Sequence, residues 1–307
     1  MPEYKRRERL MGNQFEFTIV VDAPNHAPAL LDLAVQEIAR IEALLTTYAP
    51  TSQTNLINQQ AGLQPVAVDA ELFQLIQRAN TISRITNGAF DLSYGSIDKR
   101  LWNFDTQMDA LPDLATAKKM VRLIDYRNIV LDEANQTVFL KHKGMRIGFG
   151  GIGKGYAAAC AKNVLIKAGV QNGIVNASGD LCTWGYQENG QAWTIGIAHP
   201  DDRNKAFSGM HISGLAVATS GNYEKFAMIA GKKYSHTIDP KTGLPIQGTK
   251  SVTVIANNAE LADALTTPIA VMGIKAGLAL VEQLPNVACI IIDDCNQMYT
   301  SSNIKCA

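Results

Sequence analysis

The sequence has little of what marks a nucleic-acid binder or a membrane protein. Its 307 residues carry 28 Lys and Arg against 28 Asp and Glu, so the formal net charge is zero. A general nucleic-acid binder needs an excess of positive charge, and this class is therefore excluded. No window of the sequence reaches the apolar length of a transmembrane helix. Specificity must come from a local site.

Cysteine is scarce, and its spacing excludes two further classes. The five cysteines form no CxxC pair, lie apart from the histidines and leave one over if paired, which argues against a metal cluster and a disulfide framework. We predict buried free thiols. The residues are Cys160, Cys182, Cys289, Cys295 and Cys306.

The first twenty residues lack the apolar core and the cleavage site of a signal peptide, although they are rich in positive charge. We expect a cytoplasmic protein, or a periplasmic or membrane-anchored one if an export leader was removed. The run from Lys5 to Arg9 is expected to be a solvated arm, with contact to a membrane surface as the alternative. Membrane association is thus left open.

Apolar residues, at 47% of the chain, are abundant enough for a large core. The sequence contains no low-complexity linker and no clear repeat, so we expect one domain over residues 1–307, with two closely packed subdomains as the alternative. Apolar periodicity predicts an α+β fold with mixed, largely antiparallel sheets and flanking helices. The predicted helices cover residues 28–45, 69–86 with Asp69 as an N-cap, 259–272 and 275–284, and a further helix opens at the segment 148–155 and runs to about residue 167. The predicted strands cover residues 15–21, 129–131, 137–140, 173–177, 193–198, 215–219, 251–256 and 288–293.

The segment ADALTTPIAVMG, Ala262–Gly273, carries a candidate pair of metal ligands. Asp263 and Thr267 are four residues apart, so a helix places both oxygens on one face. Oxygen ligands suit a hard cation such as Mg2+, which borrows further ligands from a substrate phosphate. Pro268 removes a helical donor beside them, and this irregularity favours function. The alternative is a polar helix face or a cap.

A glycine-rich segment, GFGGIGKG from Gly148 to Gly155, precedes a predicted helix. Glycines let backbone N–H groups approach an anion, and a helix N-terminus adds partial positive charge. The segment therefore resembles a phosphate cradle, with Lys154 as a partner of the phosphate. The alternative is a tight strand-to-helix turn, because the segment lacks both the Walker A spacing and the GxGxxG order.

Two more small-residue turns follow predicted strands, NASGDLCTWG (176–185) and ATSGNYEKF (218–226). Backbone that must approach a large polar ligand closely needs such residues, although each segment alone is an ordinary loop. Thr219 and Ser220 would donate to phosphate or finish a turn. The residues expected to contact the ligand across the three segments are Gly151, Lys154, Ser178, Gly179, Asp180, Thr219, Ser220 and Gly221.

Two ring side chains are further candidates. His236 lies in the segment HTIDPKTGLPI, just ahead of Asp239 and Pro240, where a loop histidine could act as a general base; a structural histidine is the alternative. Tyr48, in LLTTYAPTSQTNLIN, could stack on a planar ring or pack against the end of a helix. The residue types in GAFDLSYG, Gly88–Gly95, do not settle its role.

Taken in order, these segments resemble the family of ApbE-type FAD:protein FMN transferases. The resemblance covers most of the chain, and the ordered set is highly specific although no single member is. The segments that carry it are MGNQFEFTIV, LLTTYAPTSQTNLIN, GAFDLSYG, GGIGKGYAA, ATSGNYEKF, HTIDPKTGLPI, SVTVIA and ADALTT.

The resemblance implies a T-fold-like α+β architecture and an enzyme that uses FAD as substrate and Mg2+ as cofactor. It implies that Tyr48 stacks on the isoalloxazine, that the Gly153 main-chain carbonyl joins Asp263 and Thr267 at the metal, and that His236 and Asp239 lie beside the reacting phosphate. FMN would move from FAD to a Thr or Ser hydroxyl of an acceptor flavoprotein, with a respiratory redox subunit as one candidate, and AMP would be released.

The sequence departs from the family pattern at four positions. Gly148 and Ala159 stand where carboxylates are common, Ser178 replaces a frequent glycine, and Pro268 replaces a usual alanine. The alternatives are an FAD pyrophosphatase that gives FMN and AMP, and a non-catalytic FAD-binding protein. The sequence does not determine the acceptor, the oligomeric state, the number of metal ions or the effect of the two lost carboxylates.

Overall fold

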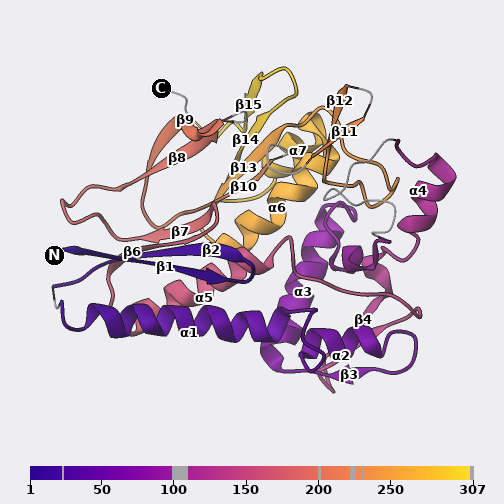
Figure 1. The fold of residues 1–307 in the computed structure, drawn as a ribbon, viewed down its shortest axis with the longest axis horizontal. Helices are drawn as coiled ribbons and strands as arrows, with labels where there is room; N and C mark the ends of the chain where they lie inside the picture. Colours follow the sequence, from indigo (N-terminus) through magenta and orange to yellow (C-terminus); the bar gives the residue numbers. More distant parts are fainter. Residues whose placement is uncertain (23, 99–109, 200–201, 222–225, 230, 305–307) are drawn as a thin grey trace.

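The computed structural model describes residues 1–307 except 23, 99–109, 200–201, 222–225, 230 and 305–307 (Figure 1). Helices and strands alternate irregularly along the chain. The helices are α1 Ala27–Leu45, α2 Gln53–Gln59, α3 Ala70–Ile85, α4 Leu114–Met120, α5 Gly153–Lys167, α6 Ala259–Met272 and α7 Ile274–Val281, with 3-10 turns η1 Leu92–Ser96 and η2 Tyr126–Asn128. The strands are β1 Glu3–Leu10, β2 Asn13–Val20, β3 Val66–Ala67, β4 Ile129–Asp132, β5 Thr137–Leu140, β6 Asn172–Ala177, β7 Asp180–Trp184, β8 Trp193–His199, β9 Asp202–Ile212, β10 Ala216–Gly221, β11 Phe226–Ile229, β12 Lys232–Ser235, β13 Ser251–Ala256, β14 Val287–Ile292 and β15 Met298–Thr300.

An eight-stranded sheet in the order β1-β2-β6-β7-β10-β13-β14-β15 forms the centre of the molecule. All strand pairs within the described residues are antiparallel, such as β13 with β14, where Ser251 lies opposite Ile292. Every residue of β7 and β13 is buried, because both faces of the central strands are covered. Strands buried on both faces give continuous apolar runs instead of alternation.

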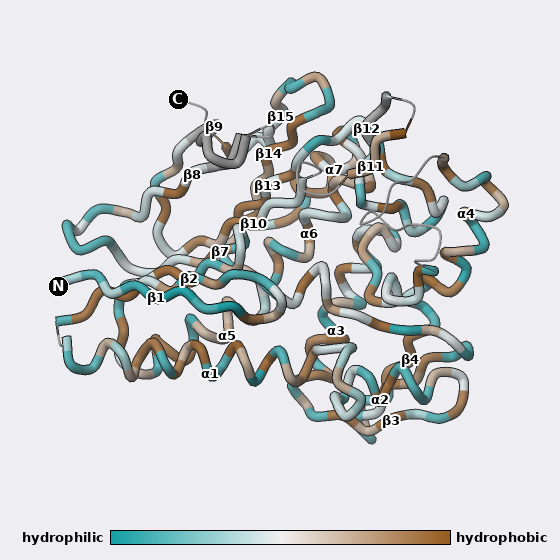
Figure 2. The backbone as a smooth tube through the Cα atoms, viewed as in Figure 1, coloured by the Kyte–Doolittle hydropathy of each residue, from teal (hydrophilic) through white to brown (hydrophobic). Residues whose placement is uncertain are grey.

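Three helices, α1, α5 and α6, cover one face of this sheet (Figure 1). The buried residues of α1 recur at helical spacing, from Leu31 through Ala34, Ile38 and Ile41 to Leu45, so one stripe faces the core. Figure 2 shows this pattern as apolar and polar segments that alternate along α1. On the opposite face, the β8–β9 hairpin closes a second apolar cluster over the sheet.

The helices α2 and α3 lie with the three-stranded sheet β3-β5-β4 at the other end of the molecule (Figure 1). Their buried residues, among them Leu72 and Val138, belong to the same core cluster as α1 and α5. A separate small cluster contains Met120 at the end of α4 and Ile238 in the loop after β12. This cluster attaches the HTIDPKTGLPI loop to α4 and η1.

Most predicted elements are confirmed, and β5, β13 and α6 have the predicted bounds. The predicted solvated arm is wrong: Lys5 to Arg9 lies in β1, paired with β2 along its whole length. Its charges sit at an edge of the sheet, where charged side chains discourage pairing with other chains. Asp69 precedes α3 as predicted, but its side chain caps no backbone N–H and accepts from the Gln53 side chain instead. Across the described residues, we find no helix with the length and apolarity that a membrane span requires.

Candidate functional site at the start of α5

The glycine-rich segment forms a turn that leads into α5. The Phe149 carbonyl accepts from the N–H groups of Ile152, at 3.2 Å, and Gly153, at 2.7 Å, and α5 begins at Gly153. Gly153 is buried, and a β-carbon there would lie 3.5 Å from both Leu45 and Met11. The start of α5 therefore lies between α1 and the β1–β2 hairpin. The alternative of a tight turn into the helix is confirmed, but no strand directly precedes it, because β5 ends at Leu140. Lys154 and Gly155 lie in the first turn of α5.

The carboxylate of Asp263 caps this helix start. The Gly155 N–H donates to Asp263 Oδ2 at 2.9 Å across the contact between α5 and α6. Asp263 is 4% exposed. A carboxylate is favoured there because helix N-terminal N–H groups carry partial positive charge. Asp263 therefore has a capping role, as the alternative held. The Gly155 N–H is already hydrogen-bonded to this side chain.

Asp180 reaches the same point from the sheet. Ser178 and Gly179 both have positive φ, at 58° and 105°, and form the two-residue turn of the β6–β7 hairpin. Such turns demand residues that tolerate the left-handed region. The turn places Asp180, which is 4% exposed, at the first position of β7. The predicted long turn is therefore wrong beyond Gly179, since Asp180–Trp184 is a buried central strand.

Lys154 lies between the two carboxylates. Its ammonium group forms an ion pair with Asp180 Oδ2, and its Nζ atom is 3.8 Å from Asp263 Oδ1. The other oxygen of Asp180 accepts from the Thr219 N–H at 3.2 Å. Thr219 in turn shares a hydrogen bond of 2.9 Å with Thr253 through their hydroxyl groups. The structure thus joins residues from α5, α6 and three strands.

The electrostatics of this cluster favour an added cation. Burial raises the pKa of Asp263 to about 7, helped by the charge of Asp180 and opposed by Lys154 and two backbone N–H groups. Burial opposes the charge on Lys154, but Asp263 and Asp180 outweigh this effect and raise its pKa above the ordinary value. When Asp263 is ionised, two carboxylates face one ammonium and leave an excess negative charge, which a cation would offset; all of the candidate ligand atoms are oxygen. The residues therefore fit a hard divalent ion such as Mg2+.

The other predicted site residues differ in their relation to the cluster: the Thr219 N–H donates to Asp180, whereas among the described residues no side-chain hydrogen bond joins Thr267 or Ser220 to it. Thr267 is half-buried one turn beyond Asp263, on α6, which continues through Pro268. Thr219, Ser220 and Gly221 belong to β10, so the predicted turn at ATSG is wrong. The rest of that turn, residues 222–225, falls outside the described residues. Gly151 lies in the turn before α5, close to Phe90.

His236 and Asp239 lie in the loop after β12, and both are half-buried. The Asp239 carboxylate accepts from the Lys241 N–H at 2.8 Å and from the Thr242 hydroxyl at 3.1 Å, which closes a tight turn. Gly243 ends this turn with φ of 73°, and a β-carbon there would lie 2.2 Å from the Ala117 carbonyl oxygen. The loop is therefore built around Asp239 and packed against α4.

Tyr48 projects from the segment between α1 and α2. Its side chain is 92% exposed. The alternative that it packs against the end of the helix is wrong, because a packed ring would be shielded. A large exposed aromatic residue is available to stack on a planar ligand.

Sequence reasoning missed two residues at this site. Met11, in the β1–β2 turn, approaches the α5 start, and Thr253 supports Thr219 from the neighbouring strand. Gly12, shortly before the predicted strand, was a usable sequence signal for a turn, and in the structure Met11 and Gly12 both have positive φ. Thr253 gave none, because its partner lies in a strand far back in the sequence.

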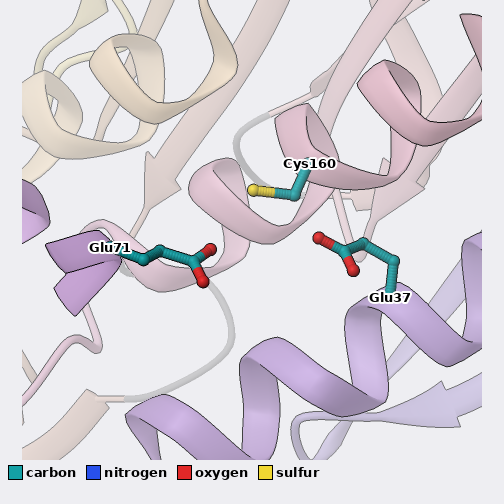
Figure 3. Close-up of side chains that lie close together, drawn as sticks. All are labelled: Glu37, Glu71 and Cys160. Carbon is teal, nitrogen blue, oxygen red and sulfur yellow. The ribbon is translucent and has the colours of Figure 1, made fainter. Parts of the chain in front are cut away.

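A second acidic cluster lies on the outer side of these helices. Glu37 of α1, Glu71 of α3 and Cys160 of α5 point toward one another (Figure 3), with ligand atoms within 4.8 Å. Arg40 bonds both carboxylates, at 2.8 Å to Glu37 and 2.6 Å to Glu71. Burial raises the pKa of Cys160 to about 11, which keeps its thiol protonated. This cluster is therefore an arginine-centred network. The described cysteines are free, as predicted, but only Cys182 and Cys289 are buried; Cys160 is half-buried, Cys295 is exposed, and Cys306 lies outside the described residues.

The sequence matches the ApbE family over residues 11–291. The chain belongs to the ApbE family. A relative from Klebsiella pneumoniae (strain 342), named FAD:protein FMN transferase, is 33% identical over 95% of this chain and 90% of its own length. A relative of the same name from Treponema pallidum is 29% identical over 98% of this chain and 88% of its own length.

Solved ApbE structures have the same fold. The crystal structure of the ApbE protein from Thermotoga maritima superposes with a TM-score of 0.88 at 28% identity, over 98% of this chain and 97% of that one. The flavin transferase ApbE from Vibrio cholerae gives a TM-score of 0.85 at 24% identity, over 98% of each chain. The predicted α+β class with ApbE architecture is therefore confirmed.

Proposed function

We propose that this ApbE-family protein transfers FMN from FAD to a Thr or Ser hydroxyl of an acceptor flavoprotein, with Mg2+ as cofactor and AMP as the second product. The observation that carries the proposal is the buried cluster of Asp180, Lys154 and Asp263 at the start of α5. The excess negative charge of this cluster would attract a divalent metal ion, and the same ion could also bind a pyrophosphate. Relatives that cover nearly the whole chain bear the name of this activity.

The metal would be held by Asp263 and Thr267, with the Gly153 main-chain carbonyl as a third ligand. When bound, Mg2+ neutralises charge on the pyrophosphate oxygens and so makes the phosphorus easier to attack. Asp180 holds the Lys154 ammonium beside Asp263. Lys154 would then supply a fixed positive charge to the pyrophosphate from within the protein.

The chemical step is a displacement at phosphorus. The acceptor hydroxyl oxygen bonds to the phosphorus on the riboflavin side of FAD, and the bond from this phosphorus to the bridging oxygen breaks. The bridging oxygen leaves with AMP. His236 takes the hydroxyl proton as the base, and Asp239 closes the turn that follows His236 in the same loop. Tyr48 stacks on the isoalloxazine, while Gly151, Ser178, Gly179, Ser220 and Gly221 line the dinucleotide.

The test supplies FAD, Mg2+ and an acceptor protein that carries a threonine at a flavin attachment site, with a respiratory redox subunit as the first candidate. We expect AMP release together with a mass gain on the acceptor equal to one FMN less water, and neither product with EDTA. Free FMN with an unmodified acceptor would identify an FAD pyrophosphatase instead. Tight FAD binding without AMP would identify a binding protein.

A further inference from the structure

Arg78 of α3 holds the first turn of α6. Its Nε atom donates to Glu260 Oε1 at 2.7 Å and its Nη2 atom donates to Glu260 Oε2 at 3.0 Å. Glu260 is 7% exposed and follows Ala259, the first residue of α6. A two-point pair of this kind fixes direction as well as distance, because the guanidinium is planar.

The same guanidinium also lies against α5. Its Cζ atom is 5.7 Å from the centre of the Tyr156 ring, within the range of a cation–π contact. Tyr156 directly follows Gly155, and its hydroxyl donates to Glu71 at 2.6 Å. Arg78 therefore contacts α5 and α6 at once, one residue from the point where the two helices meet.

That meeting point leaves no free space. A β-carbon on Gly155 would lie 2.1 Å from the Ala259 carbonyl oxygen and 2.7 Å from Asp263 Cβ. Glu260 directly follows Ala259 and lies three residues before Asp263, in the same turn of α6. A shift of the α6 start would therefore move the Asp263 carboxylate relative to the Gly155 N–H and the Lys154 ammonium.

We infer that Arg78 is a positioning residue for the proposed metal site and acts through Glu260 and Tyr156. The inference rests on the proposed function, because it takes Asp263 as a metal ligand. The Arg78 side chain is 45% exposed, so its pair with Glu260 adds little to overall stability. Groups that orient metal ligands nevertheless change metal affinity by about 10- to 100-fold when removed.

The test measures Mn2+ binding to the full chain by electron paramagnetic resonance, without FAD, so that it does not depend on turnover. We expect Arg78→Ala to weaken Mn2+ binding by about 10-fold or more. Arg78→Lys keeps the positive charge but cannot donate two parallel hydrogen bonds to Glu260. We therefore expect a loss of Mn2+ affinity that is smaller than the loss in Arg78→Ala. Arg84→Ala is the matched control, because Arg84 lies on the same helix and its side chain donates, among the described residues, to Thr81 alone, at 3.3 Å.

A second variant tests the route of the effect. Glu260→Gln keeps the size of the side chain and removes its charge, and we expect Arg78→Ala with Glu260→Gln together to lose no more Mn2+ affinity than the worse single change. The inference is overturned if Arg78→Ala binds Mn2+ like Arg84→Ala, or if the two losses add. If Arg78→Ala does not fold, unchanged Mn2+ affinity in Arg78→Lys overturns it. Absence of Mn2+ binding in the unmodified protein, both without FAD and with FAD present, would instead refute the metal site of the proposed function.

Discussion

Gly155 of α5 and Ala259 of α6 are in backbone contact, since a β-carbon on Gly155 would lie 2.1 Å from the Ala259 carbonyl oxygen. This approach lets the Asp263 carboxylate reach the Gly155 N–H at 2.9 Å. A glycine in the first turn of a helix costs some conformational entropy, and here it is needed for two helices to meet. The contact therefore links the packing of the helices to the geometry of the site.

We predict that Gly155→Ala destabilises the protein by about 1 to 3 kcal/mol, because the added methyl forces α6 away from α5. The same shift would separate Asp263 from the Gly155 N–H and weaken metal binding. Urea denaturation measures the first effect. Gly150→Ala is the control, since a β-carbon at Gly150 meets nothing within 4 Å. Equal stability of the two variants would show that the contact relaxes without cost.

A second prediction concerns Asp263→Asn. The amide oxygen of the new asparagine still accepts from the Gly155 N–H, and the substitution removes one of two buried carboxylates. We therefore expect the variant in EDTA to be at least as stable as the original protein. A ligand at 100 times its Kd stabilises the native state by about 2.7 kcal/mol, and we expect Mg2+ to give this gain only while Asp263 is present. Thermal unfolding with and without Mg2+ measures it. Asp132→Asn, in an exposed turn, should keep the Mg2+ response; a response in Asp263→Asn would remove the metal assignment.

Local pattern was sufficient for elements whose burial follows a simple period. The bounds of Ser251–Ala256 and Ala259–Met272 match the prediction, because the strand is a single apolar run and the helix begins after the polar Asn257 and Asn258 and ends at Gly273. Local pattern did not predict the strand Glu3–Leu10, because this segment is mostly charged and has no apolar face. That strand forms because it pairs with Asn13–Val20, and pairing of this kind is a tertiary effect.

The site was predictable in part for the same reason. The small residues around Lys154 and the Asp263 helix carried a local signal. The sequence predicts a turn over Asp180–Trp184, which is a strand in the structure. It begins directly after Gly179, and because it is buried on both faces its residues do not alternate between apolar and polar. Arg78 and Glu260 are 182 positions apart in the sequence, and no local pattern around either residue predicts their ion pair.

The role of GAFDLSYG, left open by its residue types, is partly explained by Asp91. Its carboxylate accepts from the Ser93 N–H at 2.8 Å, the Ser93 hydroxyl at 2.6 Å and the Tyr126 N–H at 2.7 Å. Burial, against these hydrogen bonds, raises the pKa of Asp91 from 3.8 to about 6. Between these values the native state binds more protons than the unfolded state, so the contribution of Asp91 to stability falls as the pH rises.

We therefore predict that the original protein loses about 2 to 3 kcal/mol of stability, relative to Asp91→Asn, as the pH rises from 4 to 7. The comparison is between slopes, because the amide also changes the hydrogen bond to the Tyr126 N–H and lowers stability at every pH. Urea denaturation of both proteins at pH 4, 5, 6 and 7 measures the difference. Parallel pH profiles would mean that Asp91 titrates alike in the folded and unfolded states.

Tyr94, three residues further along the same segment, holds the loop that carries His236. Its ring packs against the apolar cluster that contains Ile238. Burial raises the pKa of Tyr94 to about 12, and the nearby Ile238 backbone opposes this rise. Ile238 is 1% exposed, and its backbone forms a bridge with Pro245 across the loop. The phenol thus ties GAFDLSYG to HTIDPKTGLPI, two segments that the sequence alone does not connect.

We predict that Tyr94→Phe, which removes the oxygen next to the Ile238 backbone, costs about 0.5 to 1.5 kcal/mol. The cost should fall on the loop, because the phenylalanine ring still fills the apolar cluster of Met120, Val121 and Ile238. Amide hydrogen exchange measures this, with reduced protection expected at Ile238 and little change in the central sheet. Tyr186→Phe, at an exposed position, is the control. Unchanged protection of the Ile238 amide in Tyr94→Phe would show that another group replaces the phenol, and that the His236 loop is held by its own turn alone.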